Sequence, residues 1–504
     1  MKEGEFYVIR LHYDGYKATV VERENNILTL EEAQSHAKLA EQAMLDEMTR
    51  WHTLGAFQRM DRRLASNVID ARWVLKWKIV NSKRIIQARL VVRGFKDLQA
   101  SSLSTFAGTT SRWGQRIVNS VAVQKQWELF TADVSQSFLR GLTFADAAKL
   151  KDEVHRSVQF CMPPGSTGIL QKLPGYSDFD SLREVLEMLR CGFGLKDAPR
   201  LWNKVLRQLL LDLGMRPWQS DEQLFVWHDK PLFVPSCKLV LSTHVDDLKG
   251  AGQPDYRDRL LSALQAKFGQ LKMKHGNFEC VGVMHEQSKD CSTVWTHQQH
   301  YVPQIKTIAI GDKQLADGDE ADEDLKQLYM SLVGALAWLI LTMPAVCVYV
   351  AYLQRHTKAP TIGHVKSANR LLQWIRKNLK RRGVLYQTLQ EPLRLFALSD
   401  SAFKAQDFDG LVMRGCVIML AEAVVEEGEP HGSARRVAHK PWDTGMTVRL
   451  HLLDWYSRKH TRVVRSTCAA EPLSLFDAVN QGNVIKIALD ELHLGTRTAS
   501  RHSA

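Results

Sequence analysis

The sequence predicts an α+β protein of several domains. Its 504 residues are 45% hydrophobic, which is enough to bury several cores, so we expect two to four domains. Two strand-like runs around a polar turn predict a hairpin over 73–95. Apolar residues at helical spacing predict an amphipathic helix over 365–379. Strands and helices therefore both contribute to the expected fold.

The N-terminal part of the chain is expected to be helical before the hairpin begins. Residues 1–40 carry no motif that suggests a role. Within them, Thr29 and Glu32 predict a helix that begins with a capping box, in which each side chain bonds to the backbone N–H of the other residue. A helix is also expected over 43–48.

The hairpin and the overall charge both favour a polyanionic partner. The strands at 73–78 and 87–95 flank a polar turn at 81–83, and the hairpin is basic. The chain has a net charge of +12 at pH 7 and a pI near 9.2. Lys and Arg gain affinity for phosphates by releasing condensed counterions, so nucleic acid is the partner that this composition favours.

Three aspartates stand at the ends of strand-like runs. Asp133 follows the run 127–132, and Asp246 and Asp247 end the run that starts at Leu239. An Asp pair after a strand is usually a solvated turn. The alternative is a catalytic site, because joining nucleotides needs two divalent cations about 3.5–4 Å apart and such cations prefer carboxylate oxygens. The neighbouring segments are needed to distinguish a solvated turn from a catalytic site.

Cysteine usage and the first residues indicate where the protein works. The eight cysteines include no Cys-x-x-Cys pair, so neither a zinc knuckle nor a disulfide framework is indicated. This fits a reducing, intracellular setting. The first residues lack an apolar core of signal-peptide length, so we expect a cytoplasmic or nuclear protein that is not secreted.

One uncharged segment suggests a membrane span. Residues 332–353 carry no charge, and about 20 apolar residues suffice to cross a bilayer. Pro344 divides this run, however, and Lys326 and Arg355 flank it. We therefore expect two short buried helices that meet at the proline, and no membrane partner.

Two further segments suggest how the second half is organised. The acidic stretch 311–324 contains glycine and is interpreted as a linker. The helix expected over 365–379 is basic on its polar side, and Gly383 follows as a stop. Its basic residues either form a solvated face over a core stripe or contact nucleic acid directly, and the sequence favours neither.

The C-terminal part is expected to contain strands followed by a helix. Asp400 ends one strand-like run, 412–420 is a further strand, and Glu471 opens a helix. Asp477 and Asp490 are interpreted as ordinary polar positions on that helix. An isolated Asp and Glu at this separation would carry no functional meaning without their neighbours.

Taken in order, the motifs resemble the reverse transcriptase of copia-type retrotransposons, from about Ala43 to Glu471. The resemblance implies a right-hand polymerase of the α+β class, followed by a partial ribonuclease-H-like α/β domain. It divides the chain into an N-terminal extension of unknown role (1–40), fingers and palm (41–285), a helical thumb or connection (286–392) and the partial ribonuclease-H-like domain (393–504). The motifs that carry it are 73–78, 87–95, 133–141 (DVSQSFLRG), 194–202 (GLKDAPRLW) and 244–247 (HVDD).

The resemblance assigns roles in a two-metal reaction. Asp133 and Asp246 would each bind both cations, Mg²⁺ or Mn²⁺, with Asp247 as a lesser ligand and the carbonyl of Val134 completing one coordination sphere. Lys272 would donate a proton to the departing pyrophosphate, although an exposed lysine is more often only solvated. The implied reaction extends a primer on an RNA or DNA template with deoxynucleoside triphosphates.

The resemblance also assigns the nucleotide site. Arg89 would stack on the base and hold the triphosphate, since a planar guanidinium suits both tasks. Lys78 is a weaker candidate, because Lys76 is equally well placed on the hairpin. Phe138 would lie beneath the sugar and exclude a 2′-hydroxyl, or else be an ordinary core residue. Gly194 would allow the backbone to approach the nucleotide closely.

The chain departs from the family pattern in three places, of which His244 and the incomplete ribonuclease H site affect the expected activity. His244 replaces the usual tyrosine before Val-Asp-Asp, and Met343 and Ala345 replace charged residues beside Pro344. Asp400 and Glu471 resemble only the first two carboxylates of a ribonuclease H site, so that activity is expected to be absent. The alternative function is a decayed or co-opted fragment that binds nucleic acid without catalysis. The oligomeric state is left open.

Overall fold

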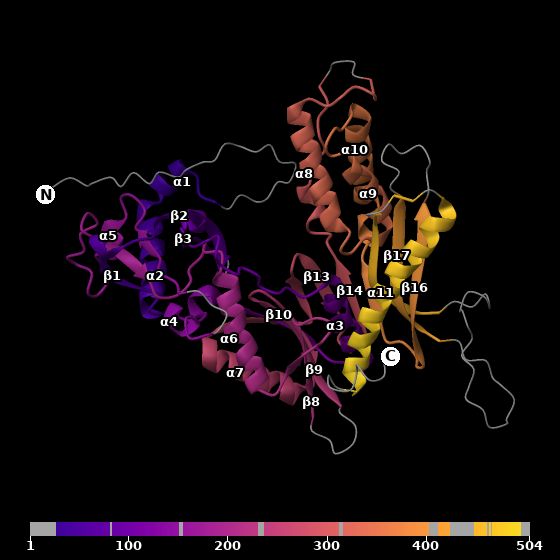
Figure 1. Ribbon diagram of the computed structural model, residues 1–504, viewed down its shortest axis with the longest axis horizontal. Coiled ribbons are helices and arrows are strands. Elements are labelled where there is room, and N and C mark those ends of the chain that lie inside the picture. Colours follow the sequence, from indigo (N-terminus) through magenta and orange to yellow (C-terminus); the bar gives the residue numbers. More distant parts are fainter. Residues whose placement is uncertain are drawn as a thin grey trace.

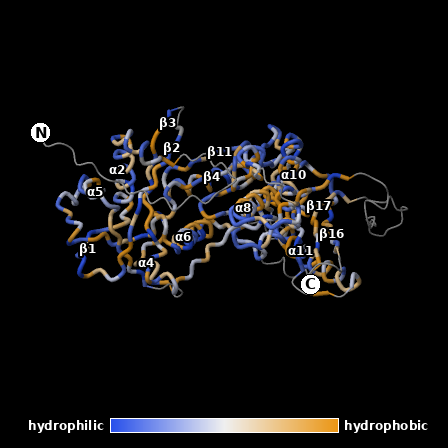
Figure 2. Tube along the Cα trace, turned by 90° about the horizontal axis from the view of Figure 1, so that it is seen from above, coloured by the Kyte–Doolittle hydropathy of each residue, from blue (hydrophilic) through white to orange (hydrophobic). Residues whose placement is uncertain are grey.

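The described part of the chain forms four antiparallel or mixed sheets joined by helices. The computed structural model describes residues 27–80, 83–150, 155–229, 236–311, 316–402, 412–423, 448–460, 463–464 and 466–494. The sheets follow one another across the molecule, with β1 and α5 at one end and β16 and β17 at the other (Figure 1). Figure 2 shows the same order from above, with β4 and α6 between the two ends.

Two helices open the described chain. Helix α1 (Leu30–Ser35) begins with the expected capping box, because Thr29 Oγ1 accepts from the N–H of Glu32 and the Glu32 carboxylate accepts from the N–H of Thr29. Helix α2 (Ala37–Thr53) contains the helix expected over 43–48. It packs against β3 and turns its apolar side into the first core.

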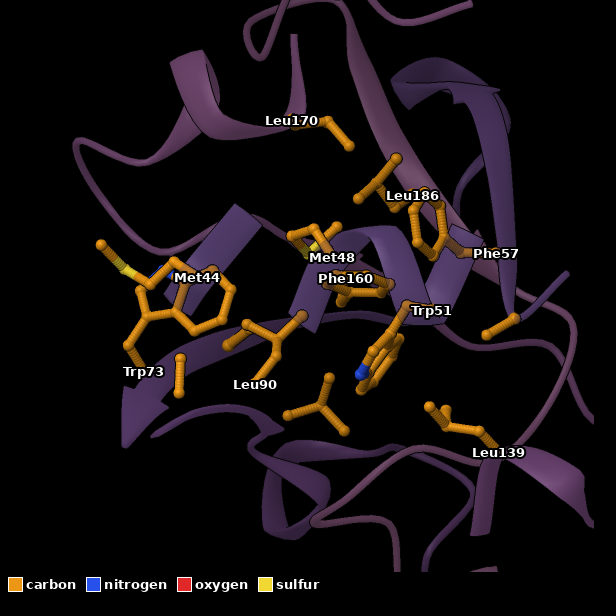
Figure 3. Packing of buried hydrophobic residues seen from close by; sticks show 14 of the residues in the cluster. Met44, Met48, Trp51, Phe57, Trp73, Leu90, Leu139, Phe160, Leu170 and Leu186 are labelled. Atoms are coloured by element: carbon orange, nitrogen blue, oxygen red, sulfur yellow. The ribbon is translucent and has the colours of Figure 1, made fainter. Parts of the chain in front are cut away.

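The first sheet has five strands in the order β1-β6-β5-β2-β3. The predicted hairpin is confirmed as β2 and β3, which pair antiparallel, while Asn81 and Ser82 of its turn lie outside the described residues. Figure 3 shows Met48 and Trp51 of α2 in the core beside this sheet, with Phe160 of β5. The strands are β1 (Phe57–Asp61), β2 (Val68–Val80), β3 (Lys83–Val92), β5 (Gln159–Cys161) and β6 (Glu184–Met188).

The second sheet has six strands and is covered on both faces. Alternate side chains point to opposite faces of a strand, so Phe130 and Ala132 of β4 pack in one core with α6 (Ala198–Asp212) and α7 (Pro254–Phe268), and Leu129 packs in another with α3 (Arg112–Lys125). The strand order is β11-β4-β10-β9-β8-β7. The strands are β4 (Leu129–Val134), β7 (Arg216–Pro217), β8 (Leu224–His228), β9 (Cys237–His244), β10 (Asp247–Gly252) and β11 (Leu271–His275).

A four-stranded sheet and three helices follow. The sheet has the order β12-β13-β14-β15, with β12 (Asn277–Cys280), β13 (Val283–Gln287), β14 (Thr293–His297) and β15 (Val384–Gln387). The helices α8 (Glu323–Leu339), α9 (Cys347–Arg355) and α10 (Ile362–Lys377) share one apolar core. Short helical turns link the larger elements at 62–64, 94–96, 144–147 (α4), 167–170 (α5), 302–304, 344–346 and 379–381.

The uncharged segment 332–353 forms two helices that are separated at Pro344, as expected. Its residues fall in α8 and α9, and the 3-10 turn 344–346 lies between them. Within the described residues, no helix is long and apolar enough to span a bilayer. The preceding acidic stretch is more than a linker, because Asp322 caps α8 and Asp317 pairs with Lys366 of α10 at 2.7 Å.

The C-terminal region is a three-stranded antiparallel sheet with one long helix. Strands β16 (Leu393–Ala402), β17 (Met413–Glu422) and β18 (Leu450–Lys459) pair in that order, and α11 (Thr467–Leu494) packs mainly on β16. The strand expected over 412–420 is confirmed as β17. Residues of this region share one hydrophobic core with α3 and β9, and α3 contacts both β18 and the six-stranded sheet, so α3 links the two sheets.

Candidate active site

Three strands bring the predicted catalytic residues together. Asp133 lies near the end of β4, where it is paired in register with Asp247 of β10 on one side and with Lys272 of β11 on the other. The Lys272 ammonium donates to Asp133 Oδ2 over 2.6 Å. Two acidic residues and one basic residue from distant parts of the sequence therefore stand in a row across the same end of the sheet.

A tight turn presents Asp246 beside this row. His244 and Asp247 are paired across the β9–β10 hairpin, so Val245 and Asp246 are its two turn residues. Val245 has φ 58°, which is an outlier for a β-branched residue and costs about 1–3 kcal/mol. Its carbonyl accepts a hydrogen bond from Trp202 Nε1 of α6 over 2.9 Å, which helps to hold the turn.

The loop after β4 forms the next wall of the site. Gln136 adopts a left-handed conformation, with φ 59°, and a short 3-10 helix begins at Ser137. Ser137 Oγ lies 3.5 Å from Asp246 Oδ2 and is oriented to donate to it. The same helix carries Phe138, whose ring meets that of Phe193 edge to face at 5.4 Å.

These residues enclose a cavity of about 480 Å³. All three aspartates line it together with Val134, Phe138 and Phe193. The basic part of the lining comes from α2 and from the hairpin. Its residues are Arg50, Lys78 and Arg89, while Lys272 lines the cavity beside Asp133.

Burial and mutual repulsion change the acidity of two of the carboxylates. Partial burial, followed by repulsion from Asp246 and Asp133, raises the pKa of Asp247 to about 6. Partial burial likewise raises the pKa of Asp246, and the Asp133 charge adds to this. A bound cation would relieve both effects, because it offsets repulsion among carboxylates and favours their charged forms.

The donor set suits a hard cation that also takes oxygens from a ligand or from water. Within the described residues, no group of three or more His, Cys, Asp and Glu side chains is arranged to hold a metal ion by itself. Lys272 supplies a positive charge to Asp133 in this arrangement. Further oxygens, from a ligand or from water, would have to complete any coordination sphere at this site.

The basic wall distinguishes two lysines that the sequence does not separate. Lys78 lines the cavity, whereas Lys76 is bridged to Ile27 and is absent from the lining. The Arg89 guanidinium lies over the Phe193 ring at 4.5 Å, which holds it against the side of the cavity. Phe193, which the sequence did not single out, therefore contacts both Arg89 and Phe138.

The local backbone geometry explains why residue 194 is a glycine. Its φ is 104°, and a Cβ at this position would overlap the carbonyl oxygen of Val92 in β3. The backbone here approaches another strand closely. Phe193 lines the cavity, whereas Gly194 does not. The close approach that the structure shows is to β3, and the expected approach to a nucleotide stays a prediction.

His244 ends β9, where it is paired with Asp247 of β10. It lines a second cavity, of about 310 Å³, together with Lys249 and Trp338. Burial lowers the pKa of His244, and the nearby Asp246 charge partly opposes this. The imidazole therefore favours its neutral form at neutral pH.

Besides Phe193, the residues of the cavity that the sequence analysis did not single out include Glu47 and Arg50 of α2 and Gln136. Glu47 is 1% exposed, and its carboxylate accepts from Arg50, from Trp51 and from Gln136. One signal was available, because an acidic residue on the buried side of a helix is rare unless it is paired.

The two C-terminal acidic residues belong to a different part of the molecule. Asp400 is exposed near the end of β16, and Glu471 lies in the second turn of α11. Neither lines the cavity that holds Asp133. Asp477 forms an ion pair with Arg414, and Asp490 pairs with Lys486 of the same helix, which is consistent with their interpretation as ordinary polar positions.

Comparison with known proteins agrees with this geometry. Residues 57–305, which include the three aspartates, match the family described as reverse transcriptase (RNA-dependent DNA polymerase). The retrovirus-related Pol polyproteins from transposons RE1 and RE2 of Arabidopsis thaliana are each 24% identical over 443 residues, 84% of this chain and 26% of theirs. A putative transposon Ty5-1 protein of Saccharomyces cerevisiae is 24% identical over 245 residues, 46% of this chain and 74% of its own length.

The chain thus spans about a quarter of the length of the two plant polyproteins. The similarity to these polyproteins extends well beyond residues 57–305, and the motifs follow the order seen in copia-type elements. These matches confirm the resemblance to the reverse transcriptase of copia-type retrotransposons that the motifs indicated, with the reverse transcriptase family matched over residues 57–305.

Proposed function

We propose that this chain is an RNA-directed DNA polymerase that extends a primer with deoxynucleoside triphosphates. The observation that carries the proposal is the side-by-side placement of Asp133 and Asp247 on β4 and β10, with Asp246 on the adjoining turn. These carboxylates share one cavity with the basic residues Arg89 and Lys78. Acidic residues facing basic ones suit a polyphosphate that arrives with cations.

Each residue has a proposed role in the reaction. Two Mg²⁺ or Mn²⁺ ions, when bound, would activate the primer hydroxyl and neutralise charge on the triphosphate. Asp133 and Asp246 would bind them, with Asp247 and the Val134 carbonyl in support. Lys272, which reaches Asp133 directly, would give a proton to the departing pyrophosphate.

The nucleotide would lie between the hairpin and the loop after β4. Arg89, held against Phe193, would bind the triphosphate and stack on the base. Phe138 would lie under the sugar, where its ring excludes a 2′-hydroxyl. Gly194 would contribute indirectly, by keeping Phe193 against β3.

The domain division follows from these roles. The five-stranded sheet with α2 would be the fingers and the six-stranded sheet the palm, together residues 41–285. The helices α8 to α10 would form the thumb or connection within 286–392. The sheet of β16 to β18 with α11 would be a partial ribonuclease-H-like domain within 393–504, and residues 1–40 would be an extension.

A primer-extension assay tests the proposal. The unmodified protein, a labelled primer on an RNA template, Mg²⁺ and deoxynucleoside triphosphates should give longer products, and so should a DNA template. The protein would act inside the cell, on a nucleic acid that its basic surface binds. If the protein binds the primer and template but never extends the primer with either cation, the chain is a nucleic-acid-binding fragment instead.

We also propose that the chain has no ribonuclease H activity. Two-metal hydrolysis needs several carboxylates around the scissile phosphate, and the family resemblance supplies only Asp400 and Glu471. A labelled RNA–DNA hybrid with Mg²⁺ should therefore stay intact. Cleavage that disappears in Glu471→Ala would contradict this proposal.

A further inference from the structure

A third cavity, which we call the outer cavity, adjoins the active-site cavity. It has a volume of about 240 Å³ and lies between α2 and the β2–β3 hairpin. The two cavities share four lining residues, Arg50, Lys78, Gln87 and Ala88. Arg50 and Lys78 therefore stand where the outer cavity opens into the one that holds the carboxylates. Arg50 precedes the segment 57–305 that matches the polymerase family.

A buried carboxylate fixes the position of Arg50. Arg50 Nε and Nη2 donate to Glu47 Oε2 over 3.2 and 2.8 Å. Glu47 is held in turn, because Trp51 Nε1 donates to its other oxygen and Gln136 Nε2 donates to Oε2. The indole of Trp51 is itself packed in the core shown in Figure 3. A carboxylate as buried as this one is stable only when paired, so the guanidinium has a fixed support.

Arg50 is nevertheless accessible to a ligand. Its side chain is 45% exposed, against 1% for that of Glu47. The bonds to Glu47 engage two of its five N–H groups, and the described part of the chain shows no other hydrogen bond from the Arg50 guanidinium. The remaining edge of the guanidinium can therefore bind an anion in the fork geometry that suits phosphate.

The charges around Arg50 favour a polyanion. Lys78 shares both cavities with it, and Arg89 adds a third positive charge on the active-site side. The one acidic residue of the outer cavity is Asp46, whose Oδ1 accepts a hydrogen bond from Gln42 over 2.7 Å. A chain of phosphates that begins at the carboxylates and extends outward would meet these basic side chains in succession.

We propose that Arg50 is a polyphosphate-binding residue that holds the outer phosphates of the incoming triphosphate and then the pyrophosphate that leaves. Glu47 is a positioning residue, because it orients Arg50 and also holds Gln136 in the loop beside Asp246. Helix α2 thus forms part of the nucleotide site. This inference rests on the proposed polymerase function and adds a subsite to it.

Binding of inorganic tripolyphosphate, measured by calorimetry, tests the subsite without any need for activity. Arg50→Gln should weaken the affinity by about tenfold, as expected when charge-assisted hydrogen bonds are lost. Arg50→Lys keeps the charge but not the fork, and should lose a smaller part of the affinity. Arg63→Gln is the matched control, because Arg63 is 89% exposed, pairs with Asp61 and lines neither cavity.

A kinetic experiment separates this inference from the proposed function. In an active enzyme, Arg50→Gln should raise KM for deoxynucleoside triphosphates and weaken inhibition by pyrophosphate, each by about tenfold, because uniform binding of the phosphates is lost. Glu47→Gln should show part of the same change. Circular dichroism should show each variant to be folded.

The outcomes are distinct. If the unmodified protein extends no primer but tripolyphosphate binding depends on Arg50, the polymerase proposal fails and the subsite stands. If tripolyphosphate binds folded Arg50→Gln or Arg50→Lys as tightly as the unmodified protein, or does not bind the unmodified protein at all, the subsite is wrong whatever the activity. In that case the Arg50–Glu47 pair only stabilises α2.

Discussion

Asp133 and Asp247 lie directly opposite each other in the antiparallel pair of β4 and β10, and Lys272 lies opposite Asp133 on its other side. Opposed residues of an antiparallel pair have their Cβ atoms about 4.5–5.5 Å apart, and like charges there are destabilising. A positive charge nearby, or a proton on one of the carboxylates, relieves this repulsion. Lys272 supplies one such charge, and we propose that the cations of the reaction supply the others.

Burial of Asp247, together with repulsion from the neighbouring carboxylates, predicts that the protein is stabilised when Asp247 is neutral. Because the pKa of Asp247 rises from an ordinary 3.8 to about 6 in the folded protein, the folded state holds this proton more tightly than the unfolded chain. The contribution to stability is therefore present below about pH 4 and is lost as the pH rises through 6. Without divalent cations, Asp247→Asn should increase the free energy of unfolding at pH 7.5 by about 1–2 kcal/mol.

The measurement is chemical denaturation at pH 7.5 and pH 4 in the presence of a chelator. The stabilising effect of Asp247→Asn should be much smaller at pH 4, where Asp247 keeps its proton in the folded unmodified protein. Added Mg²⁺ should stabilise the unmodified protein more than the variant. If Asp247→Asn destabilises the protein at pH 7.5, the described repulsion does not govern this site.

Phe138→Ala should weaken discrimination against ribonucleotides. The ring of Phe138 is partly buried beside Phe193 on the cavity wall, and its removal leaves space beneath the sugar. We expect the ratio of kcat/KM for deoxynucleotides over ribonucleotides to fall by at least about tenfold. Phe144→Ala is the control, because Phe144 is a core residue at 5% exposure and should change stability alone. An unchanged ratio in Phe138→Ala would mean that Phe138 is an ordinary core residue.

Lys272→Gln should lower kcat if Lys272 gives the proton to pyrophosphate. Loss of a general acid costs about 100-fold or more in rate. Lys274 provides a matched control, because it is two residues further along the same exposed strand and lies opposite Thr131, not an aspartate. Single-turnover extension by both variants measures the difference. Equal rates for the two variants would mean that Lys272 is not the proton donor and only forms an ion pair with Asp133.

Arg116→Ala should strongly destabilise the contact between α3 and the C-terminal sheet. The Arg116 guanidinium lies 3.5 Å from the centre of the Trp455 ring and donates to Asp454 Oδ1 over 3.1 Å. Both charged side chains are buried, at 7% and 6% exposure. Removing one partner leaves a buried charge, which costs about 3–5 kcal/mol.

Urea denaturation of Arg116→Ala measures this cost. Arg112→Ala is the comparison, because Arg112 is 48% exposed and its guanidinium lies as far as 3.9 Å from Asp454 Oδ1. This substitution should lower the free energy of unfolding by less than about 1 kcal/mol. A small effect of Arg116→Ala would mean that the C-terminal sheet contributes little to the stability of the six-stranded sheet.

Local patterns predicted the elements that carry the site. The hairpin over 73–95, the capping box at Thr29 and the division at Pro344 depend on neighbouring residues, and the structure has all three. The three aspartates could be grouped because their motifs follow a known order along the chain. The sequence also indicated in part which side of β2 faces the cavity, because the two lysines that it offered as candidates, Lys76 and Lys78, lie on the same side of that strand.

Contacts between distant segments could not be predicted in the same way. The pairing of Arg116 with Asp454 depends on how two sheets pack, and neither residue stands in a motif. Glu47 was missed because the helical pattern does not reveal that Gln136 reaches it from the loop after β4. The acidic stretch was interpreted as a linker because the sequence does not show that Asp317 reaches α10.

The central claim is that Asp246 supports polymerisation while the basic surface binds nucleic acid. The most direct measurement compares Mg²⁺-dependent primer extension and primer–template affinity in the unmodified protein, in Asp246→Ala, and in Asp258→Ala. Asp258 is the control, because it is 63% exposed on α7 and pairs with Arg257. We expect extension by the unmodified protein and by Asp258→Ala, and none by Asp246→Ala, at nearly equal affinity for nucleic acid. Extension that persists in Asp246→Ala, or that is absent from the unmodified protein with both Mg²⁺ and Mn²⁺, would contradict the account.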